Sequence, residues 1–172
     1  MSSIAWQLPE PLQRLYDYWR AKRTPGALPR YAEIDVNDIP LVLPHLVLIE
    51  PIGKGEDFRY LYSGSALIDA AGVDNTGKLM SEVLPRGPYL DYLLGIHREV
   101  LFERRPLFAE SSFRTPFLSH LWTSRLILPT IGARSDVGML VLAQIVGGRR
   151  DKAAVPYRET AEFEEGVRVL LE

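Results

Sequence analysis

The chain has 172 residues, of which 47% are hydrophobic and 24% charged, and its formal net charge is -2. This composition is typical of one globular domain, and the small net charge argues against binding to nucleic acid or to an anionic membrane surface. Cysteine is absent, which excludes disulfides, thiolate nucleophiles, cysteine-bound zinc and iron–sulfur clusters. The sequence has neither a signal peptide at Met1–Leu8 nor an apolar run long enough to span a membrane, so we expect a cytoplasmic protein.

The first periodic segment, Pro9 to Arg23, is predicted to form an amphipathic helix that ends before Pro25-Gly26. Its apolar face consists of four residues at the spacing of one helix side: Leu12, Leu15, Tyr16 and Trp19. A core of strands and central helices can form two layers without this face, so we predict that it is a homodimer interface. The alternative is that it folds back on its own sheet. Residues 24–44 are read as an extended connection.

Next come two short apolar or aromatic runs, Leu46 to Ile49 and Phe58 to Ser63, separated by a polar turn with glycines. This pattern predicts a β-hairpin. Two short helices are then expected at residues 66–71 and 79–84, the first capped by Ser65. The longest central helix is expected at residues 89–103, with His97 on its apolar stripe.

The remainder predicts three strands, at residues 107–115, 121–129 and 138–146. The last of them is apolar on both faces, like the run at residues 46–49, so both are expected inside the sheet. The strands at residues 58–63 and 107–115 mix polar and apolar residues and are expected at its edges. Beyond them lies a charged tail in which Phe163, Val167, Leu170 and Leu171 have a spacing that favours a helix.

Scattered motifs within residues 10–148 resemble a group of small bacterial stand-alone PAS-domain proteins. They are Tyr18-Trp19, Leu28-Pro29-Arg30, Ile34-Asp35, Asp38-Ile39, Leu43-Pro44, Phe58-Arg59-Tyr60, Gly64, Gly72, Thr76-Gly77 and the segment 79–84. The resemblance implies an α+β fold with a five-stranded antiparallel sheet in the order 2-1-5-4-3 and helices on one face, to which this chain adds its N-terminal amphipathic helix. The expected division is residues 1–44 for the helix and connection, 45–148 for the PAS-like core and 149–172 for the tail.

Five residues are candidates for a ligand site between helix 89–103 and the sheet. His97 and Gln144 each interrupt an otherwise apolar element, and a buried polar side chain needs a partner in the protein, in water or in a ligand. Arg125 is expected to bind a carboxylate or phosphate if it points inward, which strand alternation alone does not decide. Tyr60 and Tyr62 are expected on one face, as core residues or as pocket wall.

His97 and Gln144 also bear on cofactor binding. In haem-binding PAS sensors the iron ligand is a histidine on the corresponding helix, which makes His97 the candidate; a core histidine is the alternative. Flavin-binding PAS domains resemble this chain in carrying a glutamine on the last strand, as at Gln144, but they need a cysteine that is absent here. His45 and His120 have no partner at metal-ligand spacing, so no metal site is predicted.

We therefore expect a stand-alone PAS-type sensory or adaptor domain in signal transduction, binding a small apolar or amphipathic molecule, a signalling protein partner, or both. A ligand-free dimeric scaffold is the alternative. The motifs of hydrolases, phosphate-binding loops and dinucleotide sites are missing from the sequence, so no enzymatic activity is expected. A further alternative is a small enzyme that uses His97 and a carboxylate for acid–base chemistry.

Overall fold

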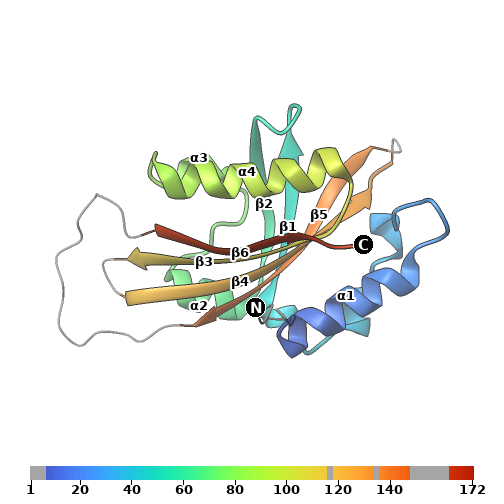
Figure 1. Ribbon diagram of the computed structural model, residues 1–172, viewed down its shortest axis with the longest axis horizontal. Coiled ribbons are helices and arrows are strands. Elements are labelled where there is room, and N and C mark those ends of the chain that lie inside the picture. The colour runs from blue at the N-terminus through green and yellow to red at the C-terminus, as the bar shows by residue number, and fades with distance from the viewer. Residues whose placement is uncertain (1–6, 116–117, 134–135, 148–162) are drawn as a thin grey trace, which may run out of the picture.

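The computed structural model describes residues 7–115, 118–133, 136–147 and 163–172. These ranges form one sheet with helices on both sides of it (Figure 1). The α-helices are α1 (Glu10–Lys22), α2 (Ser65–Ala71), α3 (Met80–Val83) and α4 (Pro88–Glu103), and the short 3-10 helices are η1 (Tyr31–Glu33), η2 (Val36–Asp38) and η3 (Leu43–His45). The strands are β1 (Leu46–Ile52), β2 (Asp57–Ser63), β3 (Leu107–Thr115), β4 (Leu118–Ile131), β5 (Val137–Gly147) and β6 (Phe163–Leu170).

The six strands are antiparallel to their neighbours and follow the order β2-β1-β5-β4-β3-β6. The predicted order 2-1-5-4-3 is confirmed for the first five strands. The apolar runs in β1 and β5 do lie inside the sheet, where both faces need cover. Strand β2 lies at one edge as expected, but β3 does not, because β6 pairs with its outer side.

The helix favoured for the tail is wrong, since Phe163–Leu170 is strand β6. It pairs with β3 from Leu107↔Leu170 to Phe113↔Phe163, with one register shift between Ala109 and Ser111. The backbone N–H of Leu171 donates to the carbonyl of Pro106 at 2.8 Å, which fixes the end of the strand. The apolar positions of the tail fit a helical period, but pairing of β6 with β3 provides hydrogen bonds for backbone groups of both strands.

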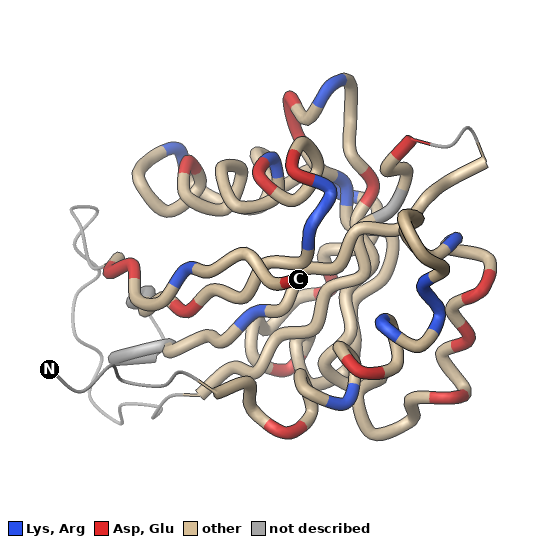
Figure 2. The backbone as a smooth tube through the Cα atoms, turned by 45° about the vertical axis from the view of Figure 1, so that its right-hand side comes forward, with Lys and Arg blue, Asp and Glu red and all other residues tan. Residues whose placement is uncertain are grey.

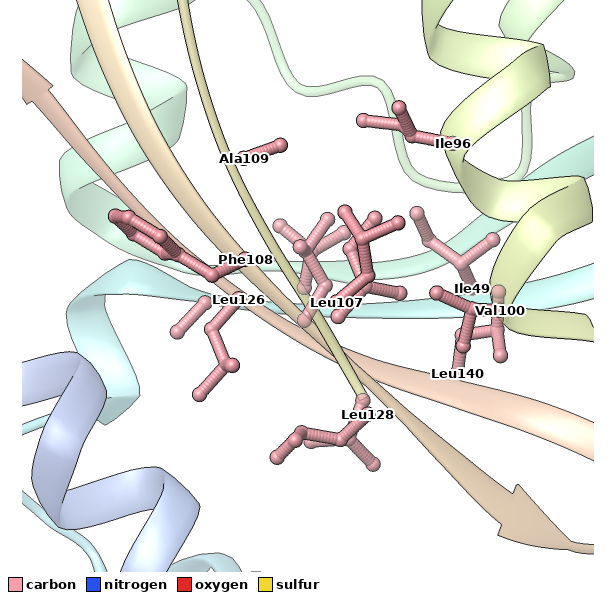
Figure 3. Close-up of a cluster of buried hydrophobic side chains, with 14 of the residues drawn as sticks. Ile49, Ile96, Val100, Leu107, Phe108, Ala109, Leu126, Leu128 and Leu140 are labelled. Carbon is pink, nitrogen blue, oxygen red and sulfur yellow. The ribbon is translucent and has the colours of Figure 1, made fainter. Parts of the chain in front are cut away.

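The two faces of the sheet follow from the strand register. Paired residues on adjacent strands share a face, and consecutive residues of a strand alternate between faces. One face carries Leu107, Ile127, Leu142 and Ile49, and the other carries Phe108, Leu126, Ala143 and Leu46. Helix α4 covers the first face with its buried Ile96 and Val100, and Val100 lies next to Ile49 and Leu140 (Figure 3).

Helix α1 covers the opposite face, and this corrects the prediction of a dimer interface for its apolar side. Leu12, Leu15, Tyr16 and Trp19 are all buried within the chain itself, with Trp19 completely inaccessible. The indole N–H of Trp19 donates to the carbonyl of Pro129 in β4 at 3.0 Å. Phe108, Leu126 and Leu128 are fully buried on this face of the sheet, so the fold-back alternative is the one observed. A partner would have to unpack α1 to reach these side chains.

Local signals in the sequence explain how two of the short helices begin or end. Gly72 ends α2 in the left-handed conformation, and the Asp35 side chain accepts from the backbone N–H of Asn37 to cap η2. The expected Ser65 cap is wrong, because Gly64 occupies that position. Acidic and basic residues are interspersed along the helices and loops (Figure 2). Among the described helices, none has the length and apolar character needed to cross a membrane.

Candidate functional site

The arginine whose direction the sequence left open points inward. Arg125 lies on β4 opposite Ala109 of β3, on the face that α4 covers, and its side chain is only 2% exposed. Its guanidinium donates to the Ser111 Oγ at 2.6 Å and to the Tyr89 hydroxyl at 2.6 Å, and it lies over the Tyr89 ring at 5.8 Å from the centroid. Its Nε has no hydrogen-bond partner among the described residues. Strand β4, strand β3 and helix α4 together hold this cation.

His97 is also buried beneath α4, with no exposed surface. Its Nδ1 lies 2.7 Å from the Leu93 carbonyl, which can only accept, so Nδ1 carries the proton and Nε2 carries a lone pair. That Nε2 is buried without a partner among the described residues. Burial, with a smaller contribution from the charge of Arg125, lowers the pKa of His97 from 6.5 to about 4, so the ring is neutral near pH 7.

The two candidate tyrosines do not share a face, contrary to expectation. The register of β1 with β2 shifts between Leu48 and Ile49, so that Tyr62 pairs with Leu48 and Tyr60 pairs with Ile49. A β-bulge of this kind reverses the alternation of the strand. Tyr60 therefore lies on the α4 face, where burial raises its pKa above the ordinary value of 10.0 and the Arg125 charge partly opposes that shift. Tyr62 lies on the other face and outside this group.

Gln144 joins the same face, because it is the direct cross-strand partner of Arg125. It is half-buried rather than enclosed. The structure thus brings four of the five candidates, Tyr60, His97, Arg125 and Gln144, to the layer between α4 and the sheet.

Sequence reasoning missed three further members of this layer: Tyr89, Tyr92 and Ser111. Tyr92 has a buried hydroxyl whose pKa is raised by desolvation, while the charge of Arg125 and a hydrogen bond with the Ser111 side chain partly oppose that shift. Tyr89 and Tyr92 lie three residues apart on α4, so both rings face the sheet, a spacing visible in the sequence. Ser111 lies two residues after Ala109 on β3, and only the strand register could have placed it beside Arg125.

Strand β6 closes one side of this layer. The Phe163 ring lies 5.4 Å from the Tyr89 ring and 4.8 Å from the Tyr92 ring, between centroids. Arg168 of β6 also forms an ion pair with Glu99 of α4. Tyr89 and Phe163 are half-buried, so they stand between the enclosed polar groups and solvent.

The geometry does not fit haem at His97. The Phe58 ring packs against the imidazole at 5.3 Å between centroids, and both side chains have no exposed surface. A macrocycle bound to Nε2 would have to displace much of this packing. His45 lies in η3, while the side chain of His120 is outside the described residues. Within the part of the chain that the structure describes, no group of three His, Cys, Asp or Glu residues could hold a metal ion.

The comparisons with known proteins agree with the arrangement of the strands. The family model described as PAS domain matches residues 8–142, which includes α1 and all of the first four strands. Among curated proteins, no match to the chain was found.

Proposed function

Because this chain belongs to the PAS-domain family, we propose that it is a sensory or adaptor module that binds a small molecule between α4 and the sheet. Domains of this family are typically sensory or interaction modules, and the proposal assigns this one a ligand site and a signalling protein partner. The site is the layer formed by Tyr60, Tyr92, His97, Arg125 and Gln144.

One observation carries the proposal. Two buried polar atoms lie in this layer without a hydrogen-bond partner among the described residues: Arg125 Nε and His97 Nε2. A buried polar group left unpaired typically costs about 1–3 kcal/mol, and more when it is charged. Native proteins satisfy the great majority of such groups, so two in one layer, one of them on a buried cation, favour a bound molecule that supplies the missing partners.

Native mass spectrometry of the protein purified from its own host tests this function. We expect a non-covalent mass that is present under native conditions and lost on denaturation. Arg125→Met should lose the bound mass, while Arg59→Met should keep it, because Arg59 lies on the exposed side of edge strand β2. Wild-type protein that is empty in every preparation would contradict ligand binding and favour the scaffold alternative.

An absorption spectrum of the same sample tests whether the protein binds haem. A Soret band would contradict the conclusion that Phe58 and His97 are packed too closely for haem.

A further inference from the structure

The charge on Arg125 has no carboxylate partner among the described residues. The ion pairs of the described chain involve other basic side chains: Arg14, Lys22, Arg59 and Arg168. Arg125 instead meets two neutral hydroxyl groups, those of Ser111 and Tyr89. Burying an ion away from water is costly unless an opposite charge or a complete set of hydrogen bonds compensates. Among the described residues, the positive charge of Arg125 therefore lacks an opposite charge, and its Nε–H lacks an acceptor.

A hydrogen-bond acceptor lies in the same layer. His97 is neutral, and its Nδ1 proton is held by the Leu93 carbonyl, so Nε2 can only accept. Arg125 is near enough to His97 for its charge to act on the imidazole. An anion alone would satisfy Arg125 and leave Nε2 unpaired. A molecule that satisfies both must carry an acceptor with negative charge and also an O–H or N–H donor.

The remaining surroundings are aromatic and aliphatic. Phe58 and Ile96 are completely buried beside His97, and Phe163 packs against Tyr89 and Tyr92. A ligand body lying among these groups gains by being apolar.

We propose that the ligand is a small monocarboxylate with a hydroxyl group on an apolar or aromatic body. The carboxylate accepts from Arg125 Nε, and the hydroxyl donates to His97 Nε2. This assignment rests on the proposed ligand-binding function and specifies its chemistry.

A carboxylate fits better than a phosphate dianion because of the balance of charge. Arg125 is the only Lys, Arg, Asp or Glu among the buried residues that the structure describes. One guanidinium neutralises one carboxylate and can bind both of its oxygens. A phosphate monoester would bring nearly twice that negative charge into a layer whose other polar groups are neutral.

The test uses full-length protein freed of bound molecules by unfolding and refolding, with 4-hydroxyphenylacetate as the probe. Its matched controls are 4-hydroxyphenylacetamide, which lacks the charge, and phenylacetate, which lacks the hydroxyl. Binding is followed by the NMR resonance of the Arg125 Nε–H at millimolar ligand. We expect the acid to shift this resonance and to bind at least about tenfold more tightly than the amide, and phenylacetate to bind more weakly.

Arg125→Met should remove the preference for acid over amide, and Arg59→Met should retain it. The wild-type comparison of acid with amide stands even if Arg125→Met does not fold. Equal or tighter binding of the amide overturns the carboxylate assignment while leaving ligand binding intact. Binding of phenylacetate as tight as the hydroxylated acid overturns the role of His97 Nε2. If a series of hydroxylated acids from glycolate to 4-hydroxyphenylacetate leaves the resonance unmoved, the assignment fails. The mass of a molecule bound to native protein then decides separately whether ligand binding survives.

Discussion

His97 makes stability depend on pH as well as lining the site. Its pKa falls from 6.5 in the unfolded chain to about 4 in the fold, mainly through burial. Between these two pH values the imidazole is protonated in the unfolded chain and neutral in the fold. The stability that this residue contributes is therefore fully present above the pKa of the unfolded state, and it is lost as the pH falls toward the pKa of the folded state. Arg125 faces the imidazole from β4 and adds to the same effect, and the aromatic ring of Phe58 packs beside it.

We expect the free energy of unfolding to be roughly 2 kcal/mol lower at about pH 5 than at about pH 7.5 because of this residue. Urea denaturation of wild type and His97→Gln at both pH values measures the effect. The variant should lose most of this pH dependence, whatever its absolute stability. An equally steep dependence in the variant would assign the effect to other groups.

Gly64 is required by a close backbone approach. A Cβ atom there would lie 2.3 Å from the carbonyl oxygen of Pro44 and 2.5 Å from that of Leu43, both of which are backbone atoms that cannot rotate away. Gly64→Ala should therefore destabilise the fold by roughly 1–3 kcal/mol or more. Thermal or urea unfolding followed by circular dichroism measures the change.

Gly95 in α4 is the matched control for Gly64. A Cβ atom at this position would meet nothing within 4 Å, and alanine favours a helix over glycine by about 1 kcal/mol. Gly95→Ala should stabilise the protein slightly, so the two substitutions have opposite signs. Equal effects would show that the close approach at Gly64 does not matter.

At the scale of elements, α1 is part of the core. The double variant Leu15→Glu, Trp19→Glu buries two charges against β4 and β5 and breaks the hydrogen bond to the Pro129 carbonyl. Each unpaired buried charge costs several kcal/mol, against a typical total stability of about 5–15 kcal/mol. We expect the double variant to unfold, as seen by circular dichroism. Ala21→Glu, on the exposed side of the same helix, should remain folded, and a folded double variant would contradict the role of α1.

The elements that sequence patterns identified best are those whose signals are local. The apolar runs of β1 and β5, the periodic face of α1 and the turn at Gly72 each depend on neighbouring residues. Strand β6 was mistaken for a helix because its partner β3 lies far away in the sequence, and only that pairing decides between the two periods. Local patterns also do not show which surface a helix will cover. The sequence therefore does not decide whether α1 packs on its own sheet or on a second copy of the chain.

The site residues that could be predicted from the sequence are those whose type is unusual for their element. His97 and Gln144 stand out as polar residues within apolar elements. The direction of Arg125 needed the register of β3 with β4, and the bulge that separates Tyr60 from Tyr62 leaves no sign in the alternation of β2. Tyr89, Tyr92 and Ser111 look like ordinary core residues until the strands are aligned.

At the scale of the whole molecule, the two faces of the sheet differ in character. The face under α1 is largely apolar near its centre, with Phe108, Leu126 and Leu128 fully buried. The face under α4 has an apolar half around Ile96 and Val100, which Figure 3 shows, and a polar half around Arg125. One face thus stabilises the sheet, and the other provides the groups proposed to bind a ligand.

The strand order also has a consequence for how the chain folds. The pairs β1–β2, β3–β4 and β4–β5 join strands that follow one another in sequence, whereas β1–β5 joins distant segments through only four residue pairs, Leu46↔Ala143 to Ile49↔Leu140. Closing long loops is entropically costly, so non-local pairing slows folding more than local hairpins do. We expect the β3–β5 meander and the β1–β2 hairpin to form early, β6 to add to β3 as a further non-local pairing, and the step that joins β1 to β5 to limit the rate of folding. Substitutions at this junction should then slow refolding more than they accelerate unfolding.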